Sequence, residues 1–258
     1  MSNTAATKNN AQNAAFAVSK KLITFITAGD PDMKTTGEII KTLAPYSDAI
    51  EIGLPFSDPV AEGEVIEAAN MRALAAGATT DSMFDMLDSV GCISSKLIIL
   101  TYLNPVFVYG YDAFFTRCKR ANIWGIIVPD LPYEERQEVL ERANKYGIKL
   151  ITLISPTSAE RISMLAKEAE GFIYLVSSLG VTGVRNSFSQ NLKPIIARIK
   201  EATDVPVYIG FGVSTAEQVK EIRQISHGAI IGSAIVKSIE QHGAKAAPHL
   251  KEYLEQLQ

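Results

Sequence analysis

Residues 49–64 read AIEIGLPFSDPVAEGE, and the first five have the composition of a buried strand with a carboxylate in its middle. At the surface of an antiparallel sheet, Glu51 would simply point to water. In a sheet that is covered on both faces, the same side chain would be poorly hydrated. The role of Glu51 therefore depends on the kind of sheet that this strand joins.

Short apolar runs of this kind recur along the chain at intervals mostly of 22 to 34 residues. They are nearly continuous in Ile, Leu and Val, which is typical of strands buried on both faces of a parallel sheet. The sheet is therefore predicted to be parallel. The eight runs are LITFITA from 22, AIEIG from 49, KLIILTY from 96, IWGIIVPD from 123, KLITLIS from 149, GFIYLVS from 171, VPVYIGFG from 205 and GAIIGS from 228.

Amphipathic segments lie between these runs, and four of them contain a Ser or Thr followed three residues later by an acid. This spacing fits the capping box at a helix start. The pairs are Thr35 with Glu38, Ser82 with Asp85, Thr157 with Glu160, and Ser214 with Glu217. Strand, loop and helix repeated eight times predict an α/β fold, the (β/α)8 TIM barrel. An open doubly wound sheet is the alternative, but it rarely sustains eight evenly spaced units.

The size of the chain agrees with one such barrel. Of its 258 residues, 47% are apolar and 21% charged, as in ordinary globular proteins. We expect a single barrel domain over residues 21–258, preceded by a mobile or partly helical segment over residues 1–20. Two connections are long: an extra helix from Glu64 follows the second strand, and the loop SSLGVTGVRNSFSQN follows the sixth. Both come after carboxyl ends of strands, where TIM barrels carry their active sites.

Charge and cysteine usage exclude several classes of function. The formal net charge of −3 gives no reason to expect a nucleic acid or a membrane as partner. Cys92 and Cys118 are the only cysteines and lie far apart, so we expect neither disulfides nor a Cys-x-x-Cys site, and a cytoplasmic location. No run approaches the roughly 18 apolar residues of a membrane span, and the polar N-terminus does not resemble a secretory signal.

Glu51 is the first candidate catalytic residue. In a parallel barrel it points into the barrel mouth or towards the helices, and in either place desolvation raises its pKa towards the range of a general acid and base. The alternative is a structural Glu paired with a basic residue. The turn that follows carries Asp58 and Glu62 back over the strand end. We expect these carboxylates to push their pKa values apart, which separates acid and base roles.

Glycines collect after the last three strands, in GVTG at 180–183, in GFGVS at 210–214, and at Gly232, where a helix opens at Ser233. Glycine lets backbone amides approach an anion, and a helix start presents free amides with a positive dipole end. Many TIM barrels bind phosphate after strands 7 and 8. These glycines therefore predict a phosphate site, to which Ser233 or Thr182 would add a hydroxyl. The alternative is that they only form tight turns.

Several familiar catalytic devices are absent from the sequence, among them the glycine-rich nucleotide loops, His-Glu-x-x-His and Gly-x-Ser-x-Gly. His227, His242 and His249 all fall near the C-terminus, so neither histidine catalysis nor a histidine metal site is expected. The residues predict a phosphorylated small molecule at one side of a barrel mouth and carboxylate acid–base chemistry at the other.

Six segments, in order along the chain, resemble the tryptophan synthase alpha subunit family. They are FITAGDP at 25–31, IEIGLPFSDPVAEG at 50–63, VPDLP at 128–132, GVTG at 180–183, GFGVS at 210–214 and GSAIVK at 232–237. The resemblance implies cleavage of indole-3-glycerol phosphate to indole and glyceraldehyde 3-phosphate in tryptophan biosynthesis. It also implies a beta subunit that carries pyridoxal phosphate in an alpha2beta2 complex, and no cofactor or metal in this chain.

The resemblance also implies roles for individual residues. Glu51 matches the family's catalytic Glu, and Glu62 stands where the family has an Asp that stabilises positive charge at the indole N–H; Glu64 replaces a usual Pro. The remaining matches are Phe25, Tyr174 and Phe211 for the indole pocket, Gly183, Gly212, Gly232 and Ser233 for phosphate, and Asp58 and Thr182 for loop closure and partner signalling. Two alternatives stay open: a regulatory subunit that cleaves poorly but activates a beta partner, and a free-standing lyase.

Overall fold

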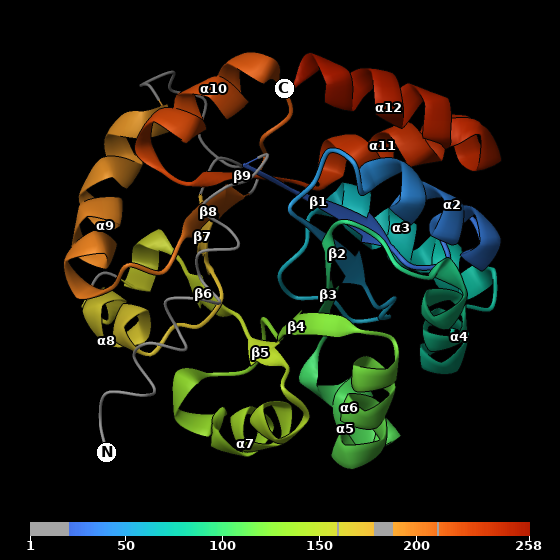
Figure 1. The fold of residues 1–258 in the computed structure, drawn as a ribbon, viewed down its shortest axis with the longest axis horizontal. Coiled ribbons are helices and arrows are strands. Elements are labelled where there is room, and N and C mark those ends of the chain that lie inside the picture. Colours follow the sequence, from blue (N-terminus) through green and yellow to red (C-terminus); the bar gives the residue numbers. More distant parts are fainter. Residues whose placement is uncertain (1–20, 159, 178–187, 211) are drawn as a thin grey trace.

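The structure is a computed structural model, and it describes residues 21–158, 160–177, 188–210 and 212–258. The described residues form one sheet of parallel strands, bent into a nearly closed barrel with the helices outside it (Figure 1). The predicted TIM barrel is therefore confirmed. The predicted N-terminal segment, residues 1–20, lies outside the described residues.

The sheet follows the order β5-β4-β3-β2-β1-β9-β8-β7-β6. All eight predicted strands are present, and the fifth is divided into β5 and β6 on either side of Ile151. Because β5 pairs with β4 and β6 pairs with β7, the two ends of the sheet meet at this residue. The strands are β1 Leu22–Thr27, β2 Ala49–Gly53, β3 Lys96–Leu100, β4 Ile123–Ile127, β5 Lys149–Leu150, β6 Thr152–Ile154, β7 Ile173–Val176, β8 Val207–Gly210 and β9 Gly228–Ile231.

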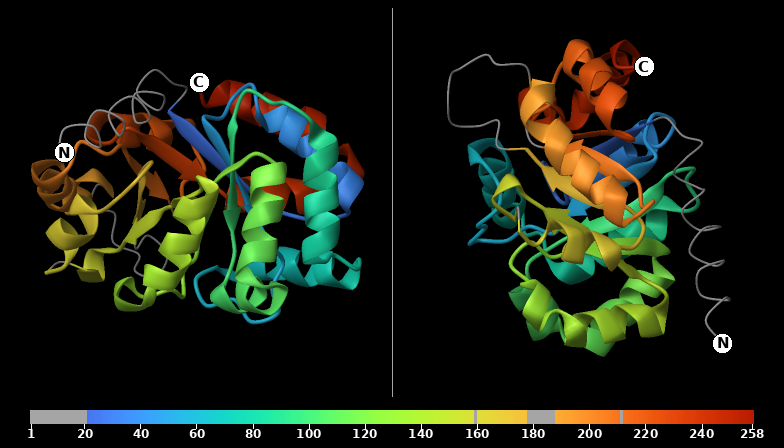
Figure 2. Two further views of the ribbon diagram at one scale, coloured as in Figure 1. Left: turned by 60° about the horizontal axis from the view of Figure 1, so that its bottom comes forward. Right: turned by 90° about the vertical axis from the view of Figure 1, so that its left-hand side faces the viewer.

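The helices lie around the outside of the ring of strands, as Figure 1 shows along the barrel and Figure 2 from two further directions. The extra helix predicted after the second strand is present as α3, whereas most of the long loop after the sixth strand lies outside the described residues. The helices are α2 Met33–Leu43, α3 Glu64–Ala75, α4 Thr80–Val90, α5 Leu103–Tyr109, α6 Tyr111–Arg120, α7 Gln137–Tyr146, α8 Ile162–Lys167, α9 Phe188–Ala202, α10 Ala216–Ile225, α11 Ser233–His242 and α12 Ala246–Gln256.

The residues predicted to cap the helices were wrong, because the caps observed for α2 and α4 lie three positions earlier in the sequence. Asp32 caps α2, and its carboxylate accepts a hydrogen bond of 2.8 Å from the Thr35 amide. Thr79 caps α4 in a capping box with Ser82, which is therefore the third helical residue and not the cap. In each case the capping residue is the one that still has extended backbone, with φ of −160° and −133° respectively.

The other two capping predictions were also wrong, one because of its register and one because the helix has no side-chain cap. The cap of α10 is Thr215, one residue after the predicted Ser214, and its partner is the amide Gln218 and not the acid Glu217. The helix α8 begins at Ile162 without a side-chain cap. Residues 156–158, which include Thr157, form a short 3-10 turn ahead of it.

Side chains alternate across β2 between the inside of the barrel and the surrounding helices. Ile50 and Ile52 belong to the large core that the helices cover, while Ala49 belongs to the inner core. Glu51 has the parity of Ala49, so it points into the barrel. The inner core beneath it consists of Ile23, Ala49, Ile98, Ile127, Ile151, Phe172, Tyr208 and Ile230.

Candidate active site at the carboxyl ends of the strands

Glu51 is buried inside the barrel, with only 1% of its surface exposed. Its Oε1 atom has no hydrogen-bond partner among the described residues. Burial raises the pKa of Glu51 from 4.5 to about 8, so at neutral pH the carboxyl group holds a proton that it can donate. The alternative of a structural Glu paired with a base finds no support in the described part of the chain.

Repulsion from neighbouring carboxylates was expected to shift the pKa of Glu51, but it does not cause the shift. Neither Asp58 nor Glu62 contributes to the raised pKa of Glu51, which comes from burial alone. Asp58 is exposed on the loop after β2, where the Ser57 hydroxyl donates to it at 2.5 Å. The prediction that these carboxylates separate their roles by mutual repulsion was therefore wrong, because low hydration is sufficient.

Phe25 forms an apolar wall beside Glu51. The two residues are register partners on the neighbouring strands β1 and β2. A Cβ atom at Gly53 would lie 2.7 Å from the Phe25 Cζ atom, and one at Gly232 would lie 3.4 Å from its Cβ atom. Gly53 therefore leaves room for this ring, whereas a Cβ atom at Gly232 would only reach ordinary van der Waals contact with it.

Tyr174 lies on β7, and its side chain packs against the inner core of the barrel. Its hydroxyl would be 2.5 Å from a Cβ atom at Gly210, so this glycine is needed for the ring to lie where it does. Burial raises the pKa of Tyr174, and the charges of Glu51 and Glu62 raise it further. Tyr174 is thus within electrostatic reach of both predicted catalytic acids. Phe211, the third predicted pocket residue, lies outside the described residues.

Glu62 is held by Tyr102, a residue that the sequence did not single out. The Tyr102 hydroxyl donates to the Glu62 carboxylate and accepts hydrogen bonds from the Val60 and Ala61 amides at 2.9 and 3.0 Å. Tyr102 is buried and lies shortly after β3, at the end of the barrel where functional residues were expected. Burial raises the pKa of Glu62.

The predicted phosphate residues lie at the ends of adjacent strands. Gly212 follows β8 and has a φ of +76°, a conformation that favours glycine. Gly232 follows β9 and precedes α11, of which Ser233 is the exposed first residue. The start of α11 has no side-chain cap. Gly183 and Thr182 lie outside the described residues.

An ion-pair cluster that the sequence did not predict connects three elements around this mouth. Asp30 follows β1 and is 2% exposed, and the Arg72 guanidinium on α3 donates to both its carboxylate oxygens at 2.9 and 2.8 Å. Arg72 also contacts Glu240 on α11 at 2.8 Å. The apolar contact of Phe25 with Ala69 and Val236 joins the same three elements. The sequence feature that could have indicated this cluster is Asp30 in the segment AGDP, an acid at the end of a buried strand.

A cavity of about 150 Å³ lies elsewhere, beside the division between β5 and β6. It is lined by residues 150–153 and by side chains of the segment after β4, including Val128, Leu131 and Tyr133. None of the predicted site residues lines it. Within the described ranges there is no group of three or more His, Cys, Asp or Glu side chains that could hold a metal ion. No helix in those ranges is long and apolar enough to cross a membrane.

A parallel barrel with a buried carboxyl group at its mouth and glycine-rich turns after its last strands has the plan of a TIM-barrel enzyme. Comparison with known proteins is more specific. The family model described as tryptophan synthase alpha chain matches residues 11–258. This chain therefore belongs to the tryptophan synthase alpha chain family, as the sequence motifs predicted.

Individual relatives agree over almost the whole chain. The tryptophan synthase alpha chain of Lacticaseibacillus casei is 47% identical over 240 residues, which cover 92% of this chain and 90% of that one. The barrel is similar to that in a solved tryptophan synthase a2b2 complex from Pyrococcus furiosus, with a TM-score of 0.85, 35% identity, and coverage of 92% and 97%. The alpha subunit of Campylobacter jejuni gives a TM-score of 0.83, 32% identity, and coverage of 92% and 94%.

Proposed function

We propose that this chain is a carbon–carbon lyase that cleaves indole-3-glycerol phosphate to indole and glyceraldehyde 3-phosphate in tryptophan biosynthesis. Membership of the alpha chain family supports this reaction. The structural observation that carries the proposal is the burial of Glu51 inside the barrel, which raises its pKa to about 8. A carboxyl group with a pKa near 8 is suited to give and take a proton at neutral pH.

Glu51 would act twice in this reaction. It first donates its proton to C3 of the indole ring, which makes the ring an acceptor for the electrons of the bond to be broken. The ionised Glu51 then takes the proton of the neighbouring glycerol hydroxyl. As that hydroxyl becomes the aldehyde, the carbon–carbon bond breaks and its electron pair returns to the ring, which leaves as indole. Glu51 has then regained its proton.

Glu62 would accept a hydrogen bond from the indole N–H, where positive charge develops after protonation at C3. Its side chain is one methylene longer than the Asp of the family. The hydrogen bond from Tyr102 supports this role, because it holds the carboxylate in place on an otherwise irregular loop. Placement matters for such a group, since an error near 1 Å can cost about 100-fold in rate.

The remaining residues would bind the substrate. Phe25, Tyr174 and Phe211 would enclose the indole ring. Gly183, Gly212, Gly232 and Ser233 would bind the phosphate, with Asp58 and Thr182 meeting as loops close over the site. The free start of α11 supports the phosphate assignment, because unpaired amides and the helix dipole favour an anion.

The partner would be a beta subunit carrying pyridoxal phosphate, in an alpha2beta2 complex. One structural neighbour comes from a tryptophan synthase a2b2 complex. Exposed apolar side chains after β2 and on α5 support a docking surface here: Val60, Phe107 and Val108 are 76%, 66% and 76% exposed. Both cysteines are free, which agrees with a cytoplasmic location.

The first experiment measures indole release from indole-3-glycerol phosphate by the purified chain, with and without a beta subunit. We expect release that rises when the beta subunit is added. The variant Glu51→Gln should lose about 100-fold or more, the ordinary contribution of a positioned acid–base group. Glu38→Gln, an exposed change on α2, is the matched control and should keep full activity.

Other outcomes would identify the alternatives. If no indole is released while the beta reaction is still activated, the chain is a regulatory subunit. If the chain releases indole but neither binds a beta subunit nor responds to one, it is a free-standing lyase. Equal cleavage by the wild-type chain and Glu51→Gln would contradict the catalytic assignment.

A further inference from the structure

The turn after β8 is fixed by hydrogen bonds to the peptide between Ser214 and Thr215, which come from two different helices. The Ser214 amide donates to the Gln218 Oε1 atom at 2.9 Å, and the Thr215 amide donates to the same oxygen at 3.1 Å. The Ser214 carbonyl accepts a hydrogen bond of 2.7 Å from the Tyr253 hydroxyl. Gln218 belongs to α10, which follows directly, whereas Tyr253 belongs to α12 at the far end of the chain.

The hydrogen bond from Tyr253 is long-range, because its donor and acceptor lie 39 positions apart in the sequence. Val213 anchors the loop in the core, while Gly212 and Ser214 on either side of it are exposed. Burial raises the pKa of Tyr253 to about 12, so its hydroxyl keeps its proton and remains a donor throughout the neutral range.

The helix that carries Tyr253 also packs against α11. The helix α11 begins at Ser233, after Gly232, so α12 packs against the helix whose start forms the second half of the predicted phosphate site. Through Tyr253 it contacts the first half, two residues from Gly212. The last helix therefore holds the loop after β8 by a direct hydrogen bond and packs against the helix that begins at the other half of the predicted site.

We infer that Tyr253 is a positioning residue for phosphate binding, which holds the loop of residues 212–215 at the correct distance from the start of α11. Tyr253 does not contact the substrate; it acts through the Ser214 carbonyl and the backbone next to Gly212. This inference rests on the proposed function, because it takes the phosphate to bind between these two segments.

The test compares Tyr253→Phe with the wild-type chain. Removal of one hydroxyl should raise the KM for indole-3-glycerol phosphate about three- to ten-fold, the usual range for one lost hydrogen bond, and change kcat less than about two-fold. Inorganic phosphate, titrated as a probe without turnover, should lose affinity by a similar factor.

Tyr46→Phe is the matched control. The Tyr46 hydroxyl also bonds to α12, at 3.0 Å from the Glu255 Oε1 atom, but on a side that does not reach the loop after β8. It should leave KM and phosphate affinity unchanged, with a melting temperature close to that of Tyr253→Phe. Equal effects of the two variants, or none from Tyr253→Phe, would overturn the inference.

The two proposals fail in different ways. If the wild-type chain binds phosphate but releases no indole, the proposed function fails, and the phosphate titration of Tyr253→Phe still decides the inference. If the wild-type chain cleaves the substrate and Tyr253→Phe behaves as Tyr46→Phe does, only the inference fails. A wild-type chain that neither binds phosphate nor releases indole would overturn both.

Discussion

At the scale of single residues, Glu51 should make stability depend on pH. Its pKa is raised from 4.5 to about 8 by burial, so between these values the native state holds a proton that the unfolded chain has lost. The free energy of unfolding therefore falls as pH rises through this window, by about 1.4 kcal/mol per pH unit. Glu51→Gln removes this dependence, and its stability relative to the wild-type chain should increase from pH 5 to pH 8.

Denaturant unfolding of both proteins at several pH values measures this difference. The exposed substitution Glu38→Gln provides the comparison, and its difference from the wild-type chain should not vary with pH in this way. A constant difference between Glu51→Gln and the wild-type chain from pH 5 to pH 8 would mean that Glu51 is ionised in the native state. It would then be unable to act as the proposed acid at neutral pH.

At the scale of elements, the sequence predicted which segments form but not where each begins. Strands covered on both faces need apolar side chains at nearly every position, so all eight could be recognised. A helix start depends on which residue keeps extended backbone, and Thr79 and Thr215 rather than Ser82 and Ser214 do so. Glu51 could be identified because a charged residue stands out in such an apolar strand. Tyr102 could be found only from the path of the loop that it holds.

The placement of α3 should depend on the ion pair of Arg72 with the buried carboxylate of Asp30. Arg72→Met leaves the Asp30 carboxylate buried without its partner, which should destabilise the protein by about 3 kcal/mol. Because α3 follows the loop of Glu62, cleavage should also slow. Both effects can be measured by denaturant unfolding and by indole release.

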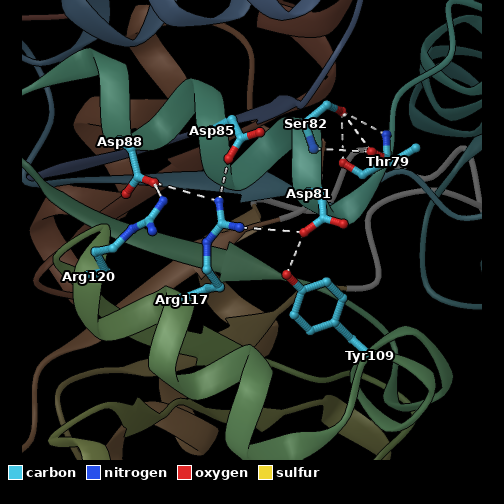
Figure 3. A network of polar contacts seen from close by, with 8 residues as sticks. All are labelled: Thr79, Asp81, Ser82, Asp85, Asp88, Tyr109, Arg117 and Arg120. Atoms are coloured by element: carbon cyan, nitrogen blue, oxygen red, sulfur yellow. Dashed lines mark hydrogen bonds and ion pairs between the residues drawn. The ribbon is translucent and has the colours of Figure 1, made fainter.

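A surface ion-pair network supplies the control for this prediction (Figure 3). Arg117 on α6 contacts Asp81, Asp85 and Asp88 of α4, and Arg120 contacts Asp88. Arg120 is 61% exposed, so Arg120→Met should cost less than about 1 kcal/mol and leave cleavage unchanged. Equal losses in the two variants would mean that burial of Asp30 has no special importance.

At the scale of the whole molecule, the number and order of the strands could be predicted, but the way the barrel closes could not. The run KLITLIS reads as one strand, yet it pairs with β4 on one side of Ile151 and with β7 on the other. Which residue interrupts a strand depends on how the last gap in the ring is bridged, and here the Ile151 amide donates to the Ile126 carbonyl at 2.9 Å. This constraint belongs to the closed ring and not to any single segment.

The exposed surface of the barrel leads to a prediction about assembly. Phe107 and Val108 project from α5, which begins directly after Tyr102, the residue that also holds Val60. Large apolar side chains gathered around one loop are typical of a protein contact. Phe107→Glu should therefore weaken binding of a beta subunit by at least about ten-fold, because a buried charge without a partner is costly in an interface.

Titration of the beta subunit, followed by its effect on indole release, measures this binding. Met164→Glu is the matched control, since Met164 is also an exposed apolar residue but lies on α8, beside the other half of the strand ring (Figure 1). Phe107→Glu should keep the cleavage rate of the isolated chain while losing the rise caused by the beta subunit, and Met164→Glu should keep both. If Phe107→Glu responds to the beta subunit as the wild-type chain does, the contact surface must lie elsewhere. If it loses cleavage in isolation, α5 serves the catalytic site directly, through Tyr102 and the loop of Glu62.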